Sequence, residues 1–164
     1  MIALECHPES RGGAVRRVVV EVDRRDGALF LAYRIEGKTE RLLVPPPGLR
    51  PIWQHTCCEA FVARPGSPAY HELNFSPSGD WAAHAFTDYR RGAPFTAPDP
   101  RIVFQALPGR MELRASVGAA PGPLLLGLSA VIEERDGTLS YWALRHAPGK
   151  PDFHHRHAFA LELA

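Results

Sequence analysis

The residues best suited to chemistry lie between Trp53 and Tyr89, in the segment WQHTCCEAFVARPGSPAYHELNFSPSGDWAAHAFTDY. One run within it carries polar or aromatic residues at alternate positions: Tyr70, Glu72, Asn74 and Ser76. Leu73 and Phe75 alternate with them and would anchor the opposite face of a strand in a core. The Glu72 and Asn74 Cα atoms would then lie about 6.6–7 Å apart, close enough to engage neighbouring hydroxyls of one ring. The competing interpretation is an ordinary solvated sheet surface.

Trp53 and Glu59 form a second candidate pair. Trp53 follows a proline-rich loop and precedes a strand-like run, so its ring could lie at a sheet rim and stack on a sugar. The alternative is a tryptophan packed in the core. Glu59 shares a predicted face with Cys57 and Phe61, where an unpaired carboxylate would be costly to bury. Its partner would be a ligand hydroxyl, water or an arginine such as Arg90.

A catalytic role for these carboxyl groups has little support in the sequence. Glu59 and Glu72 could reach the roughly 5–9.5 Å separation of a glycosidase pair if their strands were neighbours. Nothing in the sequence indicates an acid with a raised pKa. The chain also has no GxGxxG, Walker, GxSxG or HExxH motif. We therefore expect no enzymatic activity.

The segment PDFHHRH near the carboxyl end contains Asp152, His154, His155 and His157. Imidazoles and a carboxylate suit Zn²⁺, but no second ligand pair has finger-like spacing. A loop whose histidines cap backbone groups or line a cleft is favoured, with His154 as the preferred cleft residue. A haem would need an axial pair such as Met111 with His146 or His154. We expect no cofactor, and a metal at the histidines stays an open alternative.

Composition excludes several partners. The chain has 164 residues with 19 Lys+Arg and 18 Asp+Glu, a balance that gives no footprint for nucleic acid or an anionic membrane. MIALECHPES lacks the features of a secretory signal, and no window approaches the ~20 apolar residues of a membrane span. The expected location is the cytoplasm. Three cysteines fit that compartment, and Cys57 and Cys58 would point to opposite faces of a strand as buried thiols.

Short alternating runs separated by Pro and Gly favour an all-β fold. No stretch keeps an apolar 3.6-residue period for three turns. Turn signals at Asp26-Gly27, Pro108-Gly109 and Asp136-Gly137 predict hairpins. About ten to twelve strands in one domain, residues 1–164, would form an antiparallel β-sandwich of jelly-roll or immunoglobulin-like type.

Several segments of the sequence resemble those of the DOMON-like bacterial proteins related to family 9 carbohydrate-binding modules. They are WQHTCCEAF, YHELNFSPSGDW, SYWAL and PGKPDFHH, which begin at residues 53, 70, 140 and 148. The resemblance implies a jelly-roll-like sandwich without catalytic machinery and a ligand cleft lined by aromatic residues, with sugar-binding members clamping a terminal sugar between tryptophans. Some extracellular relatives bind haem instead.

The family's pattern of a cleft Trp followed six residues later by a Glu is met by Trp53 and Glu59. His55 stands where an acidic residue is common, and Trp81 and Trp142 compete for the second clamp position. We therefore predict a non-catalytic module for a saccharide or sugar derivative. Its expected ligand-binding residues are Trp53, Glu59, Asn74, Trp81, Arg90, Trp142 and His154. The alternatives are a structural or protein-interaction sandwich and a haem- or metal-binding redox domain.

Overall fold

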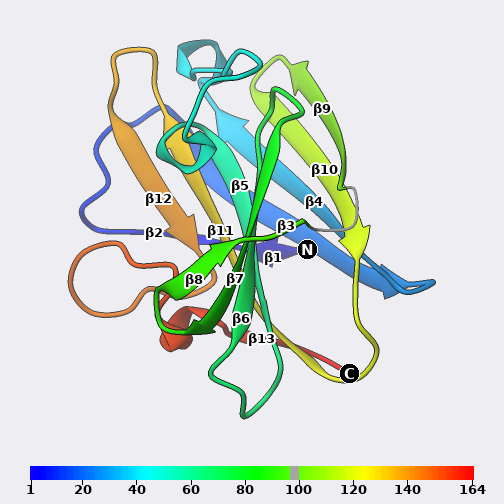
Figure 1. The fold of residues 1–164 in the computed structure, drawn as a ribbon. Coiled ribbons are helices and arrows are strands. Elements are labelled where there is room, and N and C mark those ends of the chain that lie inside the picture. Colours follow the sequence, from blue (N-terminus) through cyan, green and yellow to red (C-terminus); the bar gives the residue numbers. More distant parts are fainter. Residues whose placement is uncertain (97–99) are drawn as a thin grey trace.

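A computed structural model describes residues 1–96 and 100–164 as two antiparallel β-sheets packed face to face (Figure 1). The first sheet has the order β1-β3-β4-β10-β9. Its strands are β1 (Ile2–Ala3), β3 (Val15–Arg25), β4 (Ala28–Gly37), β9 (Arg101–Leu107) and β10 (Arg110–Gly118). This sheet forms one wall of the core.

The second sheet has the order β2-β12-β11-β5-β6-β7-β8, and β13 also pairs with β11. Its strands are β2 (Glu5–Cys6), β5 (Cys57–Ala63), β6 (Tyr70–Phe75), β7 (Trp81–Asp88), β8 (Arg91–Pro94), β11 (Leu124–Glu133), β12 (Leu139–Ala143) and β13 (Leu161–Leu163). The predicted antiparallel sandwich is confirmed. The described residues form 13 strands, slightly more than expected, because several edge strands are only two to four residues long.

The three predicted hairpins are present. Asp26-Gly27 joins β3 to β4, with φ values of 52° and 71° that suit a tight turn matching the strand twist. Pro108-Gly109 joins β9 to β10, and Asp136-Gly137 lies in the connection from β11 to β12. Local turn chemistry therefore determined these strand pairings.

Strand alternation determines which side chains enter the core. Along β4, Leu29, Leu31, Tyr33 and Ile35 are buried between the sheets, whereas the residues between them are only partly covered. On β5, Cys58 and Ala60 face the core, and Cys57 and Phe61 face the outer side. Cys57 and Cys58 are buried free thiols, and they lie on opposite faces as predicted.

The outer face of the second sheet is covered, and this cover distinguishes the two sheets. The 3-10 helix η2 (Ile52–Gln54) contacts β5 and β6. The connection from β12 to β13, orange to red in Figure 1, contains η3 (Arg156–Ala158) and bonds to β6 and to the β7–β8 turn. A third 3-10 helix, η1 (Thr39–Arg41), follows β4. Within the described ranges, no helix has the length and apolar character needed to cross a membrane.

Candidate functional site

A cleft of about 330 Å³ opens between these two covering segments and the outer face of the second sheet. We call it the outer cleft. Its lining residues are Trp53, Glu59, Glu72, His84, Phe86, Arg90, Val131, Tyr141, Pro151, Phe153 and His154. They come from the five adjacent strands β12, β11, β5, β6 and β7, from the β7–β8 turn, from η2 and from the β12–β13 connection. Four of the seven residues predicted for the ligand site therefore meet here: Trp53, Glu59, Arg90 and His154.

Trp53 stands at the rim of the outer cleft. Its neighbour Ile52 is buried and fixes η2 to the sheet, while Trp53 itself is 39% exposed. The edge-on contact with His84, at 5.3 Å between ring centroids, positions the indole without covering it. The core alternative is wrong for this residue, because a core tryptophan would not keep so much of its surface in water.

Glu59 forms the floor and is 3% exposed. Its Oε2 accepts a hydrogen bond from Ser129 Oγ at 3.2 Å, across the β5–β11 pair. Burial raises the pKa of Glu59 well above its usual range, and the nearby charge of Glu72 raises it further. Burial therefore favours the protonated form of the Glu59 carboxyl group. Arg90, the arginine considered as a partner for Glu59, donates to Asp152 instead.

Glu72 lies diagonally across the β5–β6 ladder from Glu59, since Glu59 is paired with Asn74. Its side chain is mostly buried, so the solvated-face interpretation of this run is wrong. Burial raises the pKa of Glu72, while Asn74, His84 and Arg90 oppose the rise. One carboxylate oxygen, Oε2, lies 3.7 Å from His154 Nε2 and 3.8 Å from His84 Nδ1. Both separations exceed a normal hydrogen bond.

A hydrogen-bonded chain orients His154. The backbone N–H of Arg90 donates to the Tyr70 hydroxyl at 3.1 Å, and that hydroxyl lies 2.9 Å from His154 Nδ1. Because the hydroxyl oxygen already accepts one bond, its proton is free to go to Nδ1, which leaves the imidazole proton on Nε2 facing Glu72. Burial and the charge of Arg90 lower the pKa of His154 to about 4, so the ring is neutral at pH 7.

Arg90 is held at the cleft edge by Asp152. Its Nη2 donates to Asp152 Oδ1 at 2.9 Å, and Tyr89 donates to the other oxygen of the same carboxylate. These bonds and the charge of Arg90 keep the pKa of Asp152 below its usual value, against the effect of its partial burial. The pair ties the β7–β8 turn to the β12–β13 connection, and so fixes one side of the cleft.

The other three predicted residues do not line the outer cleft. Trp142 is buried in the core between the sheets, where its indole N–H donates to Ser140 Oγ. Trp81 packs against the same core cluster. Asn74 lies beside Glu59 on the cleft side of the sheet but is fully buried, and its Nδ2 has no hydrogen-bond partner among the described residues. Neither candidate for the second clamp reaches Trp53, because both rings face inward.

The histidine-rich segment is a loop and a short helix rather than a strand. Only His154 enters the cleft, whereas His155 caps η3 by accepting from the His157 backbone N–H at 3.1 Å. Across residues 1–96 and 100–164, no three His, Cys, Asp or Glu side chains are grouped as metal ligands would be. The suggested haem axial residues are not brought together with His154, since Met111 is buried between the sheets and His154 lies beyond the second sheet. The other suggested partner, His146, has its Nε2 2.8 Å from the Glu5 carbonyl oxygen.

The sequence interpretation missed several lining residues. Tyr141 and Phe153 are adjacent aromatic rings, 6.3 Å apart, in the part of the cleft lined by β12 and its following connection. Tyr141 could have been found by alternation, since it must face opposite to Trp142. His84 shares a face with Phe86 on β7 and is paired with Glu72. Phe153 lies within PDFHH, beside an aspartate and histidines that are stronger candidates for polar chemistry.

Comparison with known proteins finds solved structures that share the fold of this chain. No protein-family model and no curated protein matches the sequence. A candidate carbohydrate-binding protein from Bacteroides uniformis ATCC 8492 superposes with a TM-score of 0.62 at 13% identity, covering 88% of this chain and 76% of that one. A family 9 carbohydrate-binding module from Caldicellulosiruptor kristjanssonii, solved with cellotriose, has a TM-score of 0.56 at 10% identity, covering 89% and 73%.

A second family 9 module structure from the same organism, solved with glucose, superposes with a TM-score of 0.55 at 9% identity. The superposition covers 89% of this chain and 76% of that one. At these identities the likeness concerns the sandwich fold. It agrees with the β-sandwich expected from the sequence.

Proposed function

We propose that the protein is a non-catalytic carbohydrate-binding module, a DOMON-like relative of family 9, and that the outer cleft receives a sugar ring. The observation that carries this proposal is the position of Trp53, whose exposed indole stands at the rim of a cleft with polar groups on its floor. An aromatic face beside convergent hydrogen-bonding groups suits a pyranose, which has apolar C–H groups and a ring of hydroxyls.

Unpaired polar atoms support a ligand rich in hydroxyls. His84 Nδ1 is buried without a hydrogen-bond partner in the described chain, and Glu72 Oε2 lies too far from either imidazole to bond directly. Buried polar groups are normally satisfied. A hydroxyl between Glu72 and the His154 Nε2–H would accept from the imidazole and donate to the carboxylate. The Glu59 carboxyl group would hydrogen-bond to a second hydroxyl.

Tyr141 and Phe153 would supply the second aromatic surface, in place of the tryptophan expected from the resemblance. The cleft volume of about 330 Å³ is near the lower end of small-molecule sites. We therefore expect one or two rings to bind, with a Kd between roughly micromolar and millimolar, since few atoms are buried.

Binding without hydrolysis is part of the proposal. A glycosidase needs one protonated and one ionised carboxyl group flanking the scissile bond. Glu59 and Glu72 instead lie side by side on the cleft floor, so they would not flank a bond of a ring that is seated above them. We expect no product from a panel of nitrophenyl glycosides. Turnover that is lost in Glu72→Gln would contradict this part.

The test is a titration of the tryptophan fluorescence with glucose, cellobiose, cellotriose and other mono- and disaccharides. A saturable change should occur with at least one sugar and disappear in Trp53→Ala. Trp81→Phe is the matched control, since it removes a tryptophan that packs on the core and should leave the affinity unchanged. Calorimetry with the same panel covers sugars that bind without an optical signal. No binding to any sugar by either method would overturn the proposal.

A further inference from the structure

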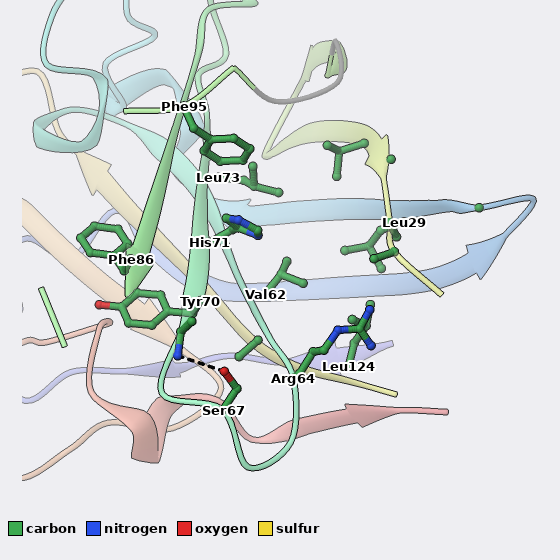
Figure 2. Close-up of a pocket in the computed structure, with 17 residues that line it drawn as sticks. Leu29, Val62, Arg64, Ser67, Tyr70, His71, Leu73, Phe86, Phe95 and Leu124 are labelled. Carbon is green, nitrogen blue, oxygen red and sulfur yellow. Dashed lines mark hydrogen bonds between the residues drawn. The ribbon is translucent and has the colours of Figure 1, made fainter. Parts of the chain in front are cut away.

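A second cavity, larger than the outer cleft, opens at one end of the sandwich between the two sheets (Figure 2). We call it the intersheet cavity. Its volume is about 610 Å³, against about 330 Å³ for the outer cleft. The first sheet contributes Leu29 and Val117, and the second contributes Val62, Leu73 and Leu124. These aliphatic side chains come from both layers, so the cavity extends into the core rather than lying on the surface.

Polar groups are confined to its rim. Figure 2 shows His71 between Phe95 and Val62, with Arg64 at the end of the cavity away from Phe95. The His71 and Phe95 rings are stacked at 4.7 Å and close the Phe95 end. Burial of part of the ring lowers the pKa of His71. Arg64 is the one arginine, and there is no lysine, aspartate or glutamate, among the described residues that line the cavity.

The charge of Arg64 is not balanced by a carboxylate. Its Nη2 donates to the Pro121 carbonyl at 2.8 Å, which holds the guanidinium beside the loop that precedes β11. The loop that carries Arg64 is fixed in turn by Arg156, whose Nη2 donates to the carbonyls of Arg64 and Ser67. Neither arginine forms a salt bridge with any residue in the described ranges 1–96 and 100–164. Arg64 therefore offers this end of the cavity a guanidinium that no carboxylate of the described chain pairs within salt-bridge distance.

An aliphatic interior with a single unbalanced cation at its mouth has the complementary chemistry of an anionic amphiphile. Burial of an acyl chain removes apolar surface of both chain and cavity from water. A carboxylate head at the mouth would accept from the guanidinium nitrogens that Pro121 does not occupy, and charge-assisted bonds of this kind are the stronger ones. A sugar would leave its hydroxyls unsatisfied among these side chains.

We propose that the intersheet cavity binds a single aliphatic chain with an anionic head group, a fatty-acid-like ligand whose carboxylate rests on Arg64. This site is separate from the proposed sugar site and does not depend on it. The two cavities share Phe86 in their linings, but the acyl chain would contact residues of the core face and the sugar those of the outer face.

The test uses calorimetric titration of the full chain with octanoate, decanoate and dodecanoate below their micelle concentrations. We expect 1:1 binding, with Kd falling about threefold to fourfold for each added methylene that becomes buried. Dodecyltrimethylammonium has a chain of the same length and the opposite charge, and it should bind at least tenfold more weakly. Equal affinity for both head groups, or no saturable binding of any chain, would overturn the proposal.

Variants locate the site. Val62→Phe fills the interior and should abolish dodecanoate binding, with a thermal melt to verify folding. Arg64→Gln should raise Kd at least tenfold at low salt, and Arg64→Lys should recover part of the loss. Arg17→Gln is the charge-matched control, because it removes an exposed arginine from the other sheet. Dodecanoate binding that is insensitive to Arg64→Gln would overturn the assignment of the head group, even if Val62→Phe did not fold.

Two further measurements distinguish binding in the intersheet cavity from binding in the outer cleft and from binding to membranes. Trp53→Ala should retain dodecanoate affinity, whereas loss of fatty-acid binding in that variant would place the ligand in the outer cleft and overturn the proposal. Sedimentation with vesicles of phosphatidylcholine and phosphatidylglycerol should leave the protein in the supernatant. Binding to vesicles without any binding of monomeric dodecanoate would contradict a single-chain site.

Discussion

The outer cleft and the intersheet cavity are formed from opposite faces of the same strand, β6, and they differ in chemistry. Glu72 faces outward to a floor of titratable groups, while His71 and Leu73 face the intersheet cavity. Both regions exclude much of the solvent, but one buries carboxyl groups and the other buries aliphatic groups. The alternation of the strand allows these two environments to lie one residue apart.

The difference shows that burial has opposite consequences on the two faces. Around Leu73, burial contributes to stability through the hydrophobic effect. Around Glu59, burial raises the pKa and opposes ionisation, so the same loss of water costs free energy at neutral pH. A floor of this kind is retained at a cost in stability, which is typical of functional sites.

The largest expected effect on stability comes from the intersheet side. Leu73→Ala, at a residue 4% exposed, should lower the free energy of unfolding by about 2–5 kcal/mol. Trp53→Ala, in the outer cleft and 39% exposed, should cost about 1 kcal/mol or less because little core contact is lost. Urea unfolding of both variants measures the contrast. Equal losses would mean that η2 is part of the stabilising core.

Ligand affinity should show the reverse contrast. Trp53→Ala should weaken sugar binding at least tenfold, about 1.4 kcal/mol or more, since the stacking surface is removed. Val62→Phe, on the core face, should leave the sugar affinity within about twofold. Titration of both variants with the best-binding sugar gives the comparison. A strong loss in Val62→Phe would show that the two faces are coupled.

The buried acid predicts an unusual pH dependence. The folded-state pKa of Glu59 is raised, so the native protein binds more protons than the unfolded chain above about pH 4.5. The stabilising contribution of the protonated form is present below that pH and is lost as the pH rises towards the folded pKa. Glu59→Gln should therefore gain stability relative to the native chain between pH 5 and 8. Urea unfolding of both proteins at several pH values tests this. Stability that changes with pH in the same way for Glu59→Gln and the native chain would contradict it.

For His154 we expect the opposite dependence of stability on pH, in a different pH range. Its pKa is lowered to about 4 by burial and by Arg90, from 6.5 in an unfolded chain. Its contribution to stability is present above pH 6.5 and is lost as the pH falls towards 4. Imidazole proton resonances should titrate with a midpoint near 4 for this ring. His154→Gln should remove this part of the acid sensitivity, and a midpoint near 6.5 would contradict the buried position.

The smallest effect is expected at the cleft edge. Asp152→Asn breaks the ion pair with Arg90, which is about half exposed, so the loss should be about 1 kcal/mol or less and smaller still in high salt. Thermal unfolding at two salt concentrations measures it. A loss that salt does not reduce would show that hydrogen bonds from Tyr89 and the backbone dominate at this carboxylate.

Much of the fold was readable because its signals are local. The Asp26-Gly27 turn and the alternation along residues 29–35 involve neighbours in sequence, and both predicted the structure correctly. The location of Trp53 at a rim also followed from local features, a proline-rich loop before a strand. Trp142 was misplaced because alternation states that Tyr141 and Trp142 face opposite ways, without stating which way is inward.

The sequence by itself determined the antiparallel strands, their turns and the shared face of Glu59 with Cys57 and Phe61, because each depends on residues close in the chain. Only the tertiary structure decided that this face is covered, since the β12–β13 connection returns from about 80 residues away to place His154 against Tyr70. That long-range contact turns a sheet surface into a cleft with buried acids. It also left the other face of β6 open at one end, where the intersheet cavity lies.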